Sequence, residues 1–412
     1  MDPIKRTVLV LSSVVFLVML GIAIILPVLP LYATTLGADV FLAGVLVGAL
    51  PAARVFLDLP AGTLGDRYGN PRMMRYGLAI IAVSSFAAAI SFSYWMLLLV
   101  RILEGVGSAL YVTSSLATLA KTVPMEKRGR YMGIYVNMLL VGQVVGPVVG
   151  GAVSIQWGLR APFAAYGIAA VAGLVLLVLT LPQKEGRVEA RIEWRVAGRL
   201  LRDRSFFTVN LGSLAAFFMR GGIIATVLPF FIALNWGLNP EQTVATAGLL
   251  VTVMALASMA TVYPSGWLAD RYGRKPTFVT SLVLMGLVIP FVFFTVDLTS
   301  AIPVMVVFGL VLGLHGPLAS WATDLAPEDS MGTAMGLYRT IGDAGYFAGS
   351  VLLGGLVGLT MTPGGQMSHV PFLLAAVWMV VSGLLLITAR DPSGERARAR
   401  AKALAAESPE PK

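Results

Sequence analysis

The sequence predicts an all-α membrane protein with twelve transmembrane helices in two similar halves. Three observations lead to this fold class. Apolar residues make up 57% of the chain and charged residues only 12%, whereas soluble domains contain about 25% charged residues. Apolar runs recur at roughly the 20-residue length that a bilayer core requires of a helix. A polar segment in the first half of the chain returns in the second half.

The repeated polar segment lies between an apolar run and the next in each half. Its matching residues, all 204 positions apart, are Gly62 and Gly266, Leu64 and Leu268, Asp66 and Asp270, Arg67 and Arg271, Tyr68 and Tyr272, and Gly69 and Gly273. Two further repeats lie at nearly the same offset. Met132-Gly133 is repeated as Met335-Gly336, and Gly150-Gly151 is repeated as Gly354-Gly355. Repeats at one offset indicate a duplication, and parallel repeats of this kind are typical of transporters.

Apolar runs bounded by charge or by Pro and Gly turns define the expected helices. In order, the spans are 7–33, 40–64, 76–92, 95–119, 131–155, 161–181, 206–234, 243–267, 277–296, 301–323, 332–359 and 370–389. The first apolar stretch is longer than that of a cleaved signal peptide, so we expect it to be retained.

The basic residues predict the orientation of the chain. Of the 30 Lys and Arg residues, four lie within helices, at Arg54, Arg101, Arg220 and Arg339. Nearly all others lie at the termini or in connections on the same predicted side, and Arg160 alone lies on the opposite side. Because basic loops stay in the cytoplasm, we expect a multi-pass protein of the cell (inner or plasma) membrane with both termini cytoplasmic. The net charge of +9 then forms a cytoplasmic rim facing anionic lipids, and no nucleic-acid partner is expected.

Composition also divides the chain into segments. We expect an N-terminal bundle at 1–181, a cytoplasmic linker at 182–205, a C-terminal bundle at 206–390 and a disordered cytoplasmic tail at 391–412. Within the linker, Ile192, Val196 and Leu200 fall at helical spacing, with Arg195, Arg199 and Arg202 between them. This pattern is consistent with a short amphipathic helix on the membrane surface or with a solvated linker.

The twelve spans, the two halves and the repeated loop resemble the major facilitator superfamily over essentially the whole chain. The resemblance implies two six-helix bundles around a central cavity that opens alternately to each side. The loop resembles that family's motif A, which latches one conformation. The carried-over latch residues are Gly62, Asp66, Arg67, Arg75, Gly266, Asp270, Arg271 and Arg274. From the residues alone, aspartate suits a helix N-terminus and glycine permits close helix packing, while a loop that only sets topology is the alternative.

Two further motifs lie in the first half. Small residues at every fourth position, with a proline that bends the helix, match the family's motif C, which resembles that of proton-coupled drug and metabolite exporters: Gly142, Gly146, Pro147, Gly150 and Gly151. A generic packing face is the alternative. Arg101 and Gly105 match motif B, whose arginine is implicated in proton transfer. Glu104 lies one turn from Arg101, so the pair is either structural or carries the proton.

Other intramembrane polar residues are functional candidates because burying them is costly. Asp343, one turn from Arg339, is a second candidate proton site, and Arg54 and Asp58 form a similar pair. Arg220 either meets an acid from another helix or binds an anionic substrate group. The expected substrate-binding residues are Arg220, Tyr32, Asn137, Gln143, His315 and Tyr338.

We therefore expect a proton-coupled exporter of small hydrophobic molecules or drugs, acting as a monomer among membrane lipids. The sequence has no cysteine, no phosphate-binding loop, no metal-ligand cluster and no nucleophile with its base, so neither an enzyme activity nor a metal or other cofactor is expected. Two alternatives stay open. One is a transporter of an anionic metabolite or sugar with Arg220 as the anion clamp, and the other is a lipid flippase or a non-transporting receptor.

Overall fold

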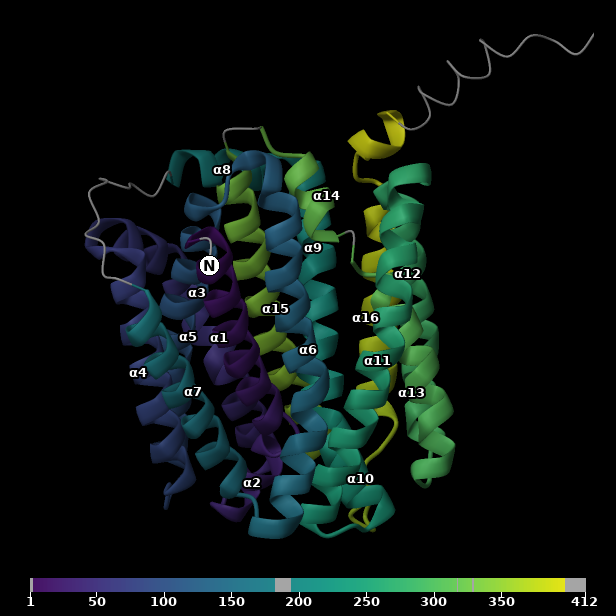
Figure 1. Ribbon diagram of the computed structural model, residues 1–412. Helices are drawn as coiled ribbons and strands as arrows, with labels where there is room; N and C mark the ends of the chain where they lie inside the picture. Colours follow the sequence, from purple (N-terminus) through teal and green to yellow (C-terminus); the bar gives the residue numbers. More distant parts are fainter. Residues whose placement is uncertain (1–2, 182–193, 317, 328–329, 397–412) are drawn as a thin grey trace, which may run out of the picture. The chain divides into compact units, whose positions relative to one another are not determined.

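The computed structural model describes residues 3–181, 194–316, 318–327 and 330–396, and no strand occurs within them. Figure 1 shows the helices. The helices of the first sequence half are α1 (Pro3–Ile25), α2 (Leu29–Thr35), α3 (Val40–Tyr68), α4 (Asn70–Ala89), α5 (Tyr94–Thr122), α6 (Met125–Trp157) and α7 (Ala161–Thr180).

The second sequence half contains shorter and less regular elements. They are α8 (Trp194–Arg202), α9 (Arg204–Met219), the π-helix η1 (Arg220–Val227), α10 (Leu228–Trp236), α11 (Pro240–Tyr272), α12 (Arg274–Val288), the 3₁₀ helix η2 (Ile289–Phe294), α13 (Leu298–Gly313), α14 (Leu318–Asp324), α15 (Met331–Leu359) and α16 (Val370–Leu386).

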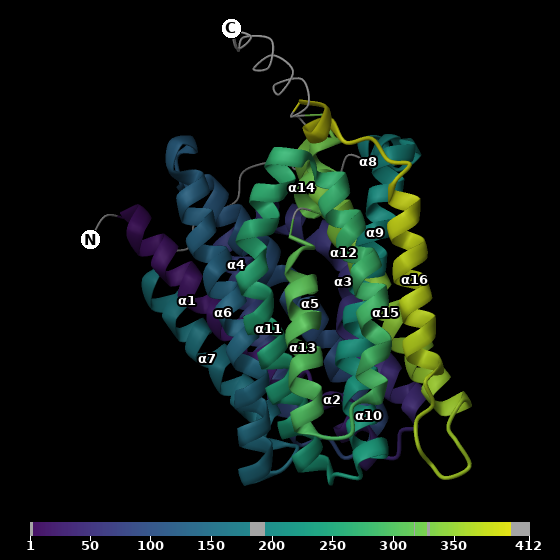
Figure 2. The same ribbon diagram turned by 90° about the vertical axis from the view of Figure 1, so that its right-hand side faces the viewer.

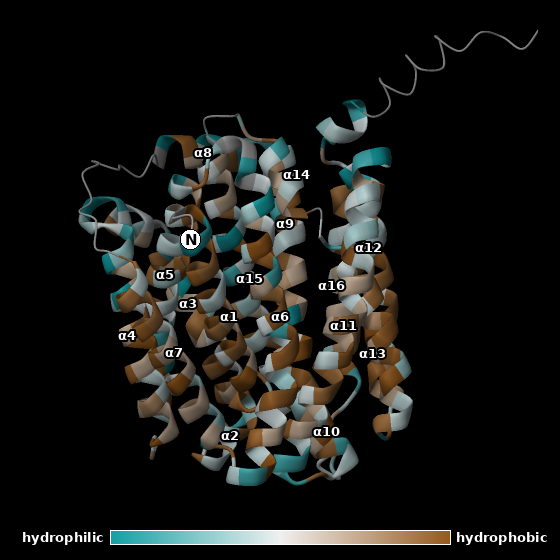
Figure 3. Ribbon diagram, in the orientation of Figure 1, coloured by the Kyte–Doolittle hydropathy of each residue, from teal (hydrophilic) through white to brown (hydrophobic). Residues whose placement is uncertain are grey.

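Every expected span overlaps at least one helix, and the predicted all-α membrane fold is confirmed. Two spans are interrupted: residues 26–28 separate α1 from α2, and residues 314–316 form a turn after α13. Among the residues that the structure describes, ten helices or helix runs are long and apolar enough to cross a membrane, and Figure 3 shows their mainly hydrophobic residues. The other two spans fall outside this count. The helix α16 has only 17 residues, and α4 begins with Arg72 and Arg75, which lower its mean hydropathy.

Two glycines of the repeated loop end one long helix and begin the next. Gly69, between α3 and α4, has a φ of 93°, and Gly273, between α11 and α12, has a φ of 101°. Side chains disfavour this backbone conformation, whereas glycine adopts it without strain. The repeat in the sequence is therefore also a repeat in backbone geometry.

Contacts divide the chain into two compact units that cut across the sequence halves. The first unit contains 1–192, 220–252 and 346–371, and the second contains 193–219, 253–345 and 372–412. In the first unit, α1 packs most extensively on α6, and α4 packs on α5 and α7. The expected bundles at 1–181 and 206–390 remain a prediction, because the first unit also includes parts of later helices.

Those later helices join the first unit through close backbone contacts. A Cβ on Gly44 of α3 would meet the backbone of Ser350 on α15, and a Cβ on Gly248 of α11 would meet the carbonyl of Pro147 on α6. Glycine is the residue that allows helix backbones to approach this closely. Within the first unit, the end of the bundle near Trp157 is thus closed by helices from both sequence halves.

The second unit is built from α8, α9, α12, α13, α14 and α16 with parts of α11 and α15. Figure 2 shows α12, α13 and α16 from the side. A Cβ on Gly286 of α12 would lie 2.7 Å from the Ala376 carbonyl of α16, and Gly309 of α13 contacts Met254 of α11 in the same way. Small residues again set the helix spacing.

The expected linker and tail are only partly described. The linker contains α8, whose Ala197 and Leu200 are buried while Arg199 and Arg202 are among its last residues. This segment is therefore helical, and its place on the membrane surface stays a prediction. The expectation of disorder from Asp391 onward is wrong for residues 391–396. Asp391 is 4% exposed and holds several hydrogen bonds. Residues 182–193 and 397–412 lie outside the described part of the chain.

Candidate functional site

A buried ion pair lies within the first unit. Arg101 and Glu104 are on consecutive turns of α5, and the Arg101 Nη1 donates to the Glu104 Oε2 over 2.5 Å. The side chains are 5% and 0% exposed. Burying two charges is costly unless their geometry is good, so the short contact stabilises a pair that the surroundings otherwise disfavour.

Helices α1 and α7 supply part of the environment of this pair. Tyr166 of α7 interacts electrostatically with both Glu104 and Arg101. Its ring packs directly against Gly21 of α1, where even a Cβ would overlap it. The sequence did not single out Tyr166, because its proximity depends on the packing of α7 and not on local spacing.

Some polar atoms of this pair and of Tyr166 have no hydrogen-bond partner within the described chain. Among the residues that the structure describes, the Glu104 Oε1, the Arg101 Nε and the Tyr166 hydroxyl have no hydrogen-bond partner. Buried polar atoms in native proteins usually have a protein or water partner. The pair is therefore a polar centre within an apolar bundle, and it contains a carboxylate that can take up a proton.

The two other expected pairs differ from this one. On α3, the Arg54 Nη2 lies 3.6 Å from the Asp58 Oδ2, and Asp58 is 9% exposed. On α15, Asp343 is 4% exposed and lies one turn from Arg339. All three candidate acids are thus buried, and the Glu104 carboxylate lies closer to its arginine than the Asp58 carboxylate does.

Arg220 begins the π-helix η1. Its side chain is exposed, whereas the following residues through Val227 are buried. Gly221 and Gly222 contact the backbones of Tyr346 and Gly349 on α15 within the first unit. π-Helical turns are rare in proteins, and those that occur are often found at functional sites. Sequence spacing did not predict this π-helix.

The remaining expected substrate residues have different environments. The Tyr32 hydroxyl donates to the carbonyls of Ala88 and Ser91, each over 3.2 Å. Asn137 and Gln143 of α6 are exposed in this unit, and the Gln143 Nε2 lies 3.8 Å from the Met19 sulfur. Tyr32 is thus engaged in contacts between helices, whereas the side-chain amides of Asn137 and Gln143 are accessible.

In the second unit, His315 and Tyr338 both contact neighbouring helices. The His315 Nδ1 lies 2.8 Å from the Ser281 hydroxyl, and the imidazole meets the Phe278 ring edge to face, with 5.4 Å between centroids. Tyr338 is half-buried and meets Phe217, with 6.3 Å between ring centroids. Their role in substrate binding stays a prediction.

The first copy of the repeated loop is held by two contacts from distant residues. The Lys121 Nζ at the end of α5 lies 2.5 Å from the Asp66 Oδ1, and the Arg75 Nη2 donates to the Leu181 carbonyl over 2.5 Å. Arg67 lies over the ring of its neighbour Tyr68. In this structure the Asp66 carboxylate therefore pairs with a lysine.

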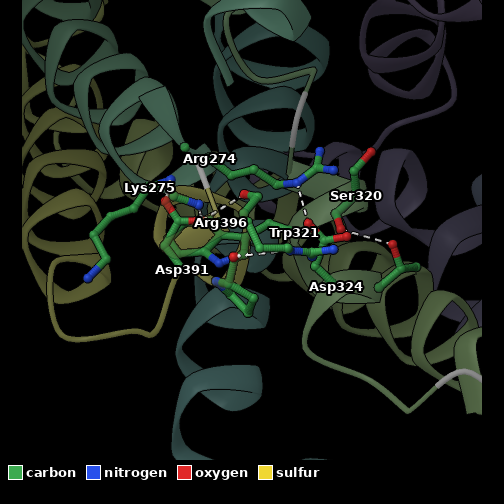
Figure 4. Close-up of polar contacts among 12 residues, drawn as sticks. Arg274, Lys275, Ser320, Trp321, Asp324, Asp391 and Arg396 are labelled. Carbon is green, nitrogen blue, oxygen red and sulfur yellow. Dashed lines mark hydrogen bonds and ion pairs between the residues drawn. The ribbon is translucent and has the colours of Figure 1, made fainter. Parts of the chain in front are cut away.

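The second copy uses the opposite arrangement of charges. The Arg274 Nε at the start of α12 donates to the Asp324 Oδ2 at the end of α14 over 2.6 Å (Figure 4). Arg271 lies over the rings of Trp267 and Tyr272, and Asp270 is exposed. Each copy is thus tied to a nearby helix end, with the acid on the loop in one half and the base on the loop in the other.

The expected role of glycine in the motif is not supported at two positions. A Cβ on Gly62 would make an ordinary 3.6 Å contact with Thr113, and a Cβ on Gly266 would meet no described atom within 4 Å. Close packing in the loop occurs at Gly65, next to Asn70. The expectation that Gly62 and Gly266 are needed for helix contact is therefore wrong for this conformation.

The chain beyond α16 also anchors the second copy. The Lys275 N–H donates to the Asp391 Oδ2 over 3.0 Å (Figure 4), and the Gly394 N–H donates to the Asp391 Oδ1 over 3.1 Å. The Trp321 indole donates to the Arg390 carbonyl over 2.9 Å. A carboxylate at the first turn of α12 also interacts favourably with the helix dipole.

We expect Asp391→Ala to loosen the first turn of α12. Hydrogen bonds to a charged group contribute about 1.5–3 kcal/mol, so a loss of about 2 kcal/mol should speed amide hydrogen exchange at Lys275, Thr277 and Phe278 by roughly 30-fold. The matched control is Glu395→Ala, whose side chain is exposed. Equal exchange rates in both variants would show that Asp391 does not anchor this turn.

The glycines of α6 face two different partners. Gly142, Gly146 and Gly150 pack on α1, and a Cβ on Gly142 would lie 2.7 Å from the Phe16 carbonyl. Gly151 instead faces α11, where a Cβ would lie 2.7 Å from the Ala245 Cα. One stripe therefore holds the first bundle together, and the adjacent glycine contacts a helix of the other sequence half.

The comparison with known families decides the identity of the chain. The sequence matches the Major Facilitator Superfamily over residues 11–349 and 209–410. The chain belongs to this superfamily. The family predicted from the repeated loop is thus confirmed, and the protein is a multi-pass membrane transporter.

Individual relatives and structures of the superfamily agree with this assignment. An uncharacterized MFS-type transporter of Methanocaldococcus jannaschii is 25% identical, over 86% of this chain and 92% of its own length. Multidrug resistance protein 2 of Bacillus subtilis is 26% identical, over 93% of this chain and 95% of its own. The crystal structure of a bacterial homologue of the human lysosomal transporter Spinster, in an inward-facing and occupied conformation, covers 98% of both chains with a TM-score of 0.72 and 17% identity.

Proposed function

We propose that this protein is a proton-coupled exporter of small hydrophobic molecules. The observation that carries the proposal is the buried pair of Arg101 and Glu104, with 2.5 Å between the Arg101 Nη1 and the Glu104 Oε2. A buried acid beside an arginine is a site whose protonation changes local charge strongly. The similarity to a multidrug resistance protein and the glycine-rich α6 support drugs or other lipophilic compounds as substrates.

The proposed cycle couples the charge of Glu104 to alternating access. With Glu104 ionised, the two opposite charges on α5 neutralise each other and can stay buried in the first unit. Protonation removes this neutralisation and leaves Arg101 as a buried cation, so a conformation that solvates or repositions Arg101 becomes favoured. Asp343 is the second proton-site candidate, because it is also buried one turn from an arginine.

The predicted topology gives the closed end of the first unit a role. Under this topology both termini are cytoplasmic, so the contacts between Gly151 and Ala245 and between Gly248 and Pro147 lie at the outer end. The described conformation would then be closed to the outside. Opening these contacts would release substrate outward, and the sequence repeat supplies the two halves that rock against each other.

A second candidate function rests on Arg220. Its exposed guanidinium at the first residue of the π-helix η1 is a suitable partner for a carboxylate or phosphate, because a guanidinium binds either through two parallel hydrogen bonds. This arrangement favours a proton-coupled transporter of an anionic metabolite or sugar. The two candidates predict different substrates and different sensitive residues.

The test is substrate-triggered proton movement in proteoliposomes that contain an internal pH dye. We expect lipophilic cations or neutral drugs to evoke a proton flux, with little response to organic anions. A flux evoked by anions alone, and lost in Arg220→Ala, would replace this proposal by the second candidate. If no compound class evokes a flux, proton coupling is wrong and the family assignment is unaffected.

A further inference from the structure

A line of buried hydroxyl groups continues along α5 from Glu104. Ser108, Tyr111 and Ser115 follow it at intervals of four, three and four residues. Residues spaced in this way lie on one face of a helix. All four side chains belong to residues with 0% exposure, so the polar face points into the first bundle and away from solvent and lipid.

The far end of this line continues onto a second helix. The Ser115 hydroxyl donates to the Tyr135 hydroxyl of α6 over 3.0 Å, and Tyr135 is also fully buried. The Tyr111 hydroxyl interacts electrostatically with Tyr135, and it has no hydrogen-bond partner among the described residues. These hydroxyl groups of α5 and α6 lie about two to three helical turns from Glu104 along the α5 axis, at ~10 Å for Tyr111 and ~16 Å for Ser115.

The end near Glu104 contains polar atoms that can bind further partners. Neither the Glu104 Oε1 nor the Ser108 hydroxyl has a hydrogen-bond partner within the described chain. Leaving such a buried group unsatisfied costs about 1–3 kcal/mol. Buried waters bind between polar groups of this kind, and a water that connects the carboxylate to Ser108 would satisfy both.

The charges around α5 leave this line otherwise neutral. Arg101 lies at its start, and the ion pair of Lys121 on α5 with Asp66 on α3 lies beyond its far end. Arg54 and Asp58 also lie on α3, which packs against α5. Helices α1, α4 and α6 also contact α5, and they carry charged residues only in their first two turns: Lys5 and Arg6, Arg72 and Arg75, and Glu126, Lys127, Arg128 and Arg130. These basic helix starts lie at the predicted cytoplasmic end of the first unit. Of the four residues in the line on α5, Ser115 lies nearest to that end.

We propose that Ser108, Tyr111, Ser115 and Tyr135 relay the proton between Glu104 and the predicted cytoplasmic end of the first bundle. The inference rests on the proposed role of Glu104 as the proton carrier. At each step a hydroxyl or water accepts one proton and releases another, so each group is regenerated and nothing is oxidised or reduced. Half-buried Thr118, three residues beyond Ser115, is where the line approaches the bundle surface.

This route differs from one in which Glu104 exchanges its proton through the substrate cavity. A proton that travels inside the bundle does not have to share its path with the substrate. Proton transfer and substrate exchange should then be separable by substitutions along α5. Removal of a relay hydroxyl should slow the protonation of Glu104 and leave the binding of substrate intact.

The test uses Tyr111→Phe and Ser108→Ala in the full-length protein reconstituted in proteoliposomes. We expect each to slow substrate-triggered proton movement, with a loss of roughly 100-fold for Tyr111→Phe, the lower end of what a positioned proton-transfer group contributes. Exchange of labelled for unlabelled substrate without a pH gradient should stay at the wild-type rate. The matched control is Ser114→Ala, because Ser114 is also fully buried on α5 but lies outside the line, near Gly65.

The outcomes separate the relay from the proposed function. Wild-type proton rates in both Tyr111→Phe and Ser108→Ala, together with loss of proton movement in Glu104→Gln, would overturn the relay and leave the exporter proposal intact. Equal slowing of proton movement and substrate exchange would also overturn it, since this result indicates a structural role. Absence of proton movement in the wild-type protein would remove both proposals.

Discussion

Glu104→Gln should abolish gradient-driven transport while the protein remains folded in the membrane. Gln has nearly the same shape as Glu but cannot carry the proton, so we expect the pH-gradient-driven rate to fall by at least about 100-fold. Exchange of substrate without a gradient should persist. The measurement is the ratio of these two rates in proteoliposomes, with the amount of folded protein determined from its thermal unfolding in detergent.

The arginine partner requires a control variant. Removing one member of a buried ion pair costs about 3–5 kcal/mol, because the other charge is left unpaired. The double variant Arg101→Met with Glu104→Gln removes both charges and should recover most of the stability without recovering gradient-driven transport. If Glu104→Gln loses stability but keeps its ratio of driven to exchange transport, the pair is structural only.

Gly151→Val should prevent the end of the first unit near Trp157 from closing. A Cβ at this position would lie 2.7 Å from the Ala245 Cα of α11, and a helix backbone cannot move aside as a flexible side chain can. Overpacking costs about 1–3 kcal/mol, which corresponds to roughly 5- to 150-fold less of the closed conformation. Transport should fall by a similar factor, because each cycle must pass through the closed conformation.

The natural absence of cysteine makes this prediction directly measurable. Spin labels attached through Gln156→Cys and Gln242→Cys, at exposed positions of α6 and α11, report the distance between these two helices. In Gly151→Val the distribution should shift to longer distances. The control is Gly133→Val on the same helix, where an added Cβ would meet no described atom within 4 Å. This control should keep the wild-type distribution, and an unshifted Gly151→Val distribution would contradict the closing role.

The fold was accessible from the sequence because it depends on local patterns. Hydropathy located every span, and the spacing of Arg101 and Glu104 predicted the contact that the structure contains. The positive φ of Gly69 and Gly273 gives a physical reason for the repeated glycine. Each of these features is decided within a few turns of one helix, where residue type and spacing suffice.

Features that depend on packing between helices could not be predicted from the sequence in this way. Sequence spacing did not place Tyr166 near Glu104 or connect Asp391 with Lys275, because each contact joins distant parts of the chain. It also could not distinguish Gly150, which contacts α1, from Gly266, which has no described atom within 4 Å of a Cβ. The spacing also did not predict the π-helix that begins at Arg220, in which Gly221 and Gly222 contact α15.

The most direct test of the central claim is substrate accumulation as a function of an imposed pH gradient. Proteoliposomes with an acidic interior should accumulate a lipophilic substrate against its concentration gradient, with an accumulation ratio that rises with the pH difference and collapses when an ionophore removes it. Glu104→Gln should show no accumulation at any gradient. Accumulation that is independent of the pH difference, or that is unchanged in Glu104→Gln, would contradict proton-coupled export through this buried carboxylate.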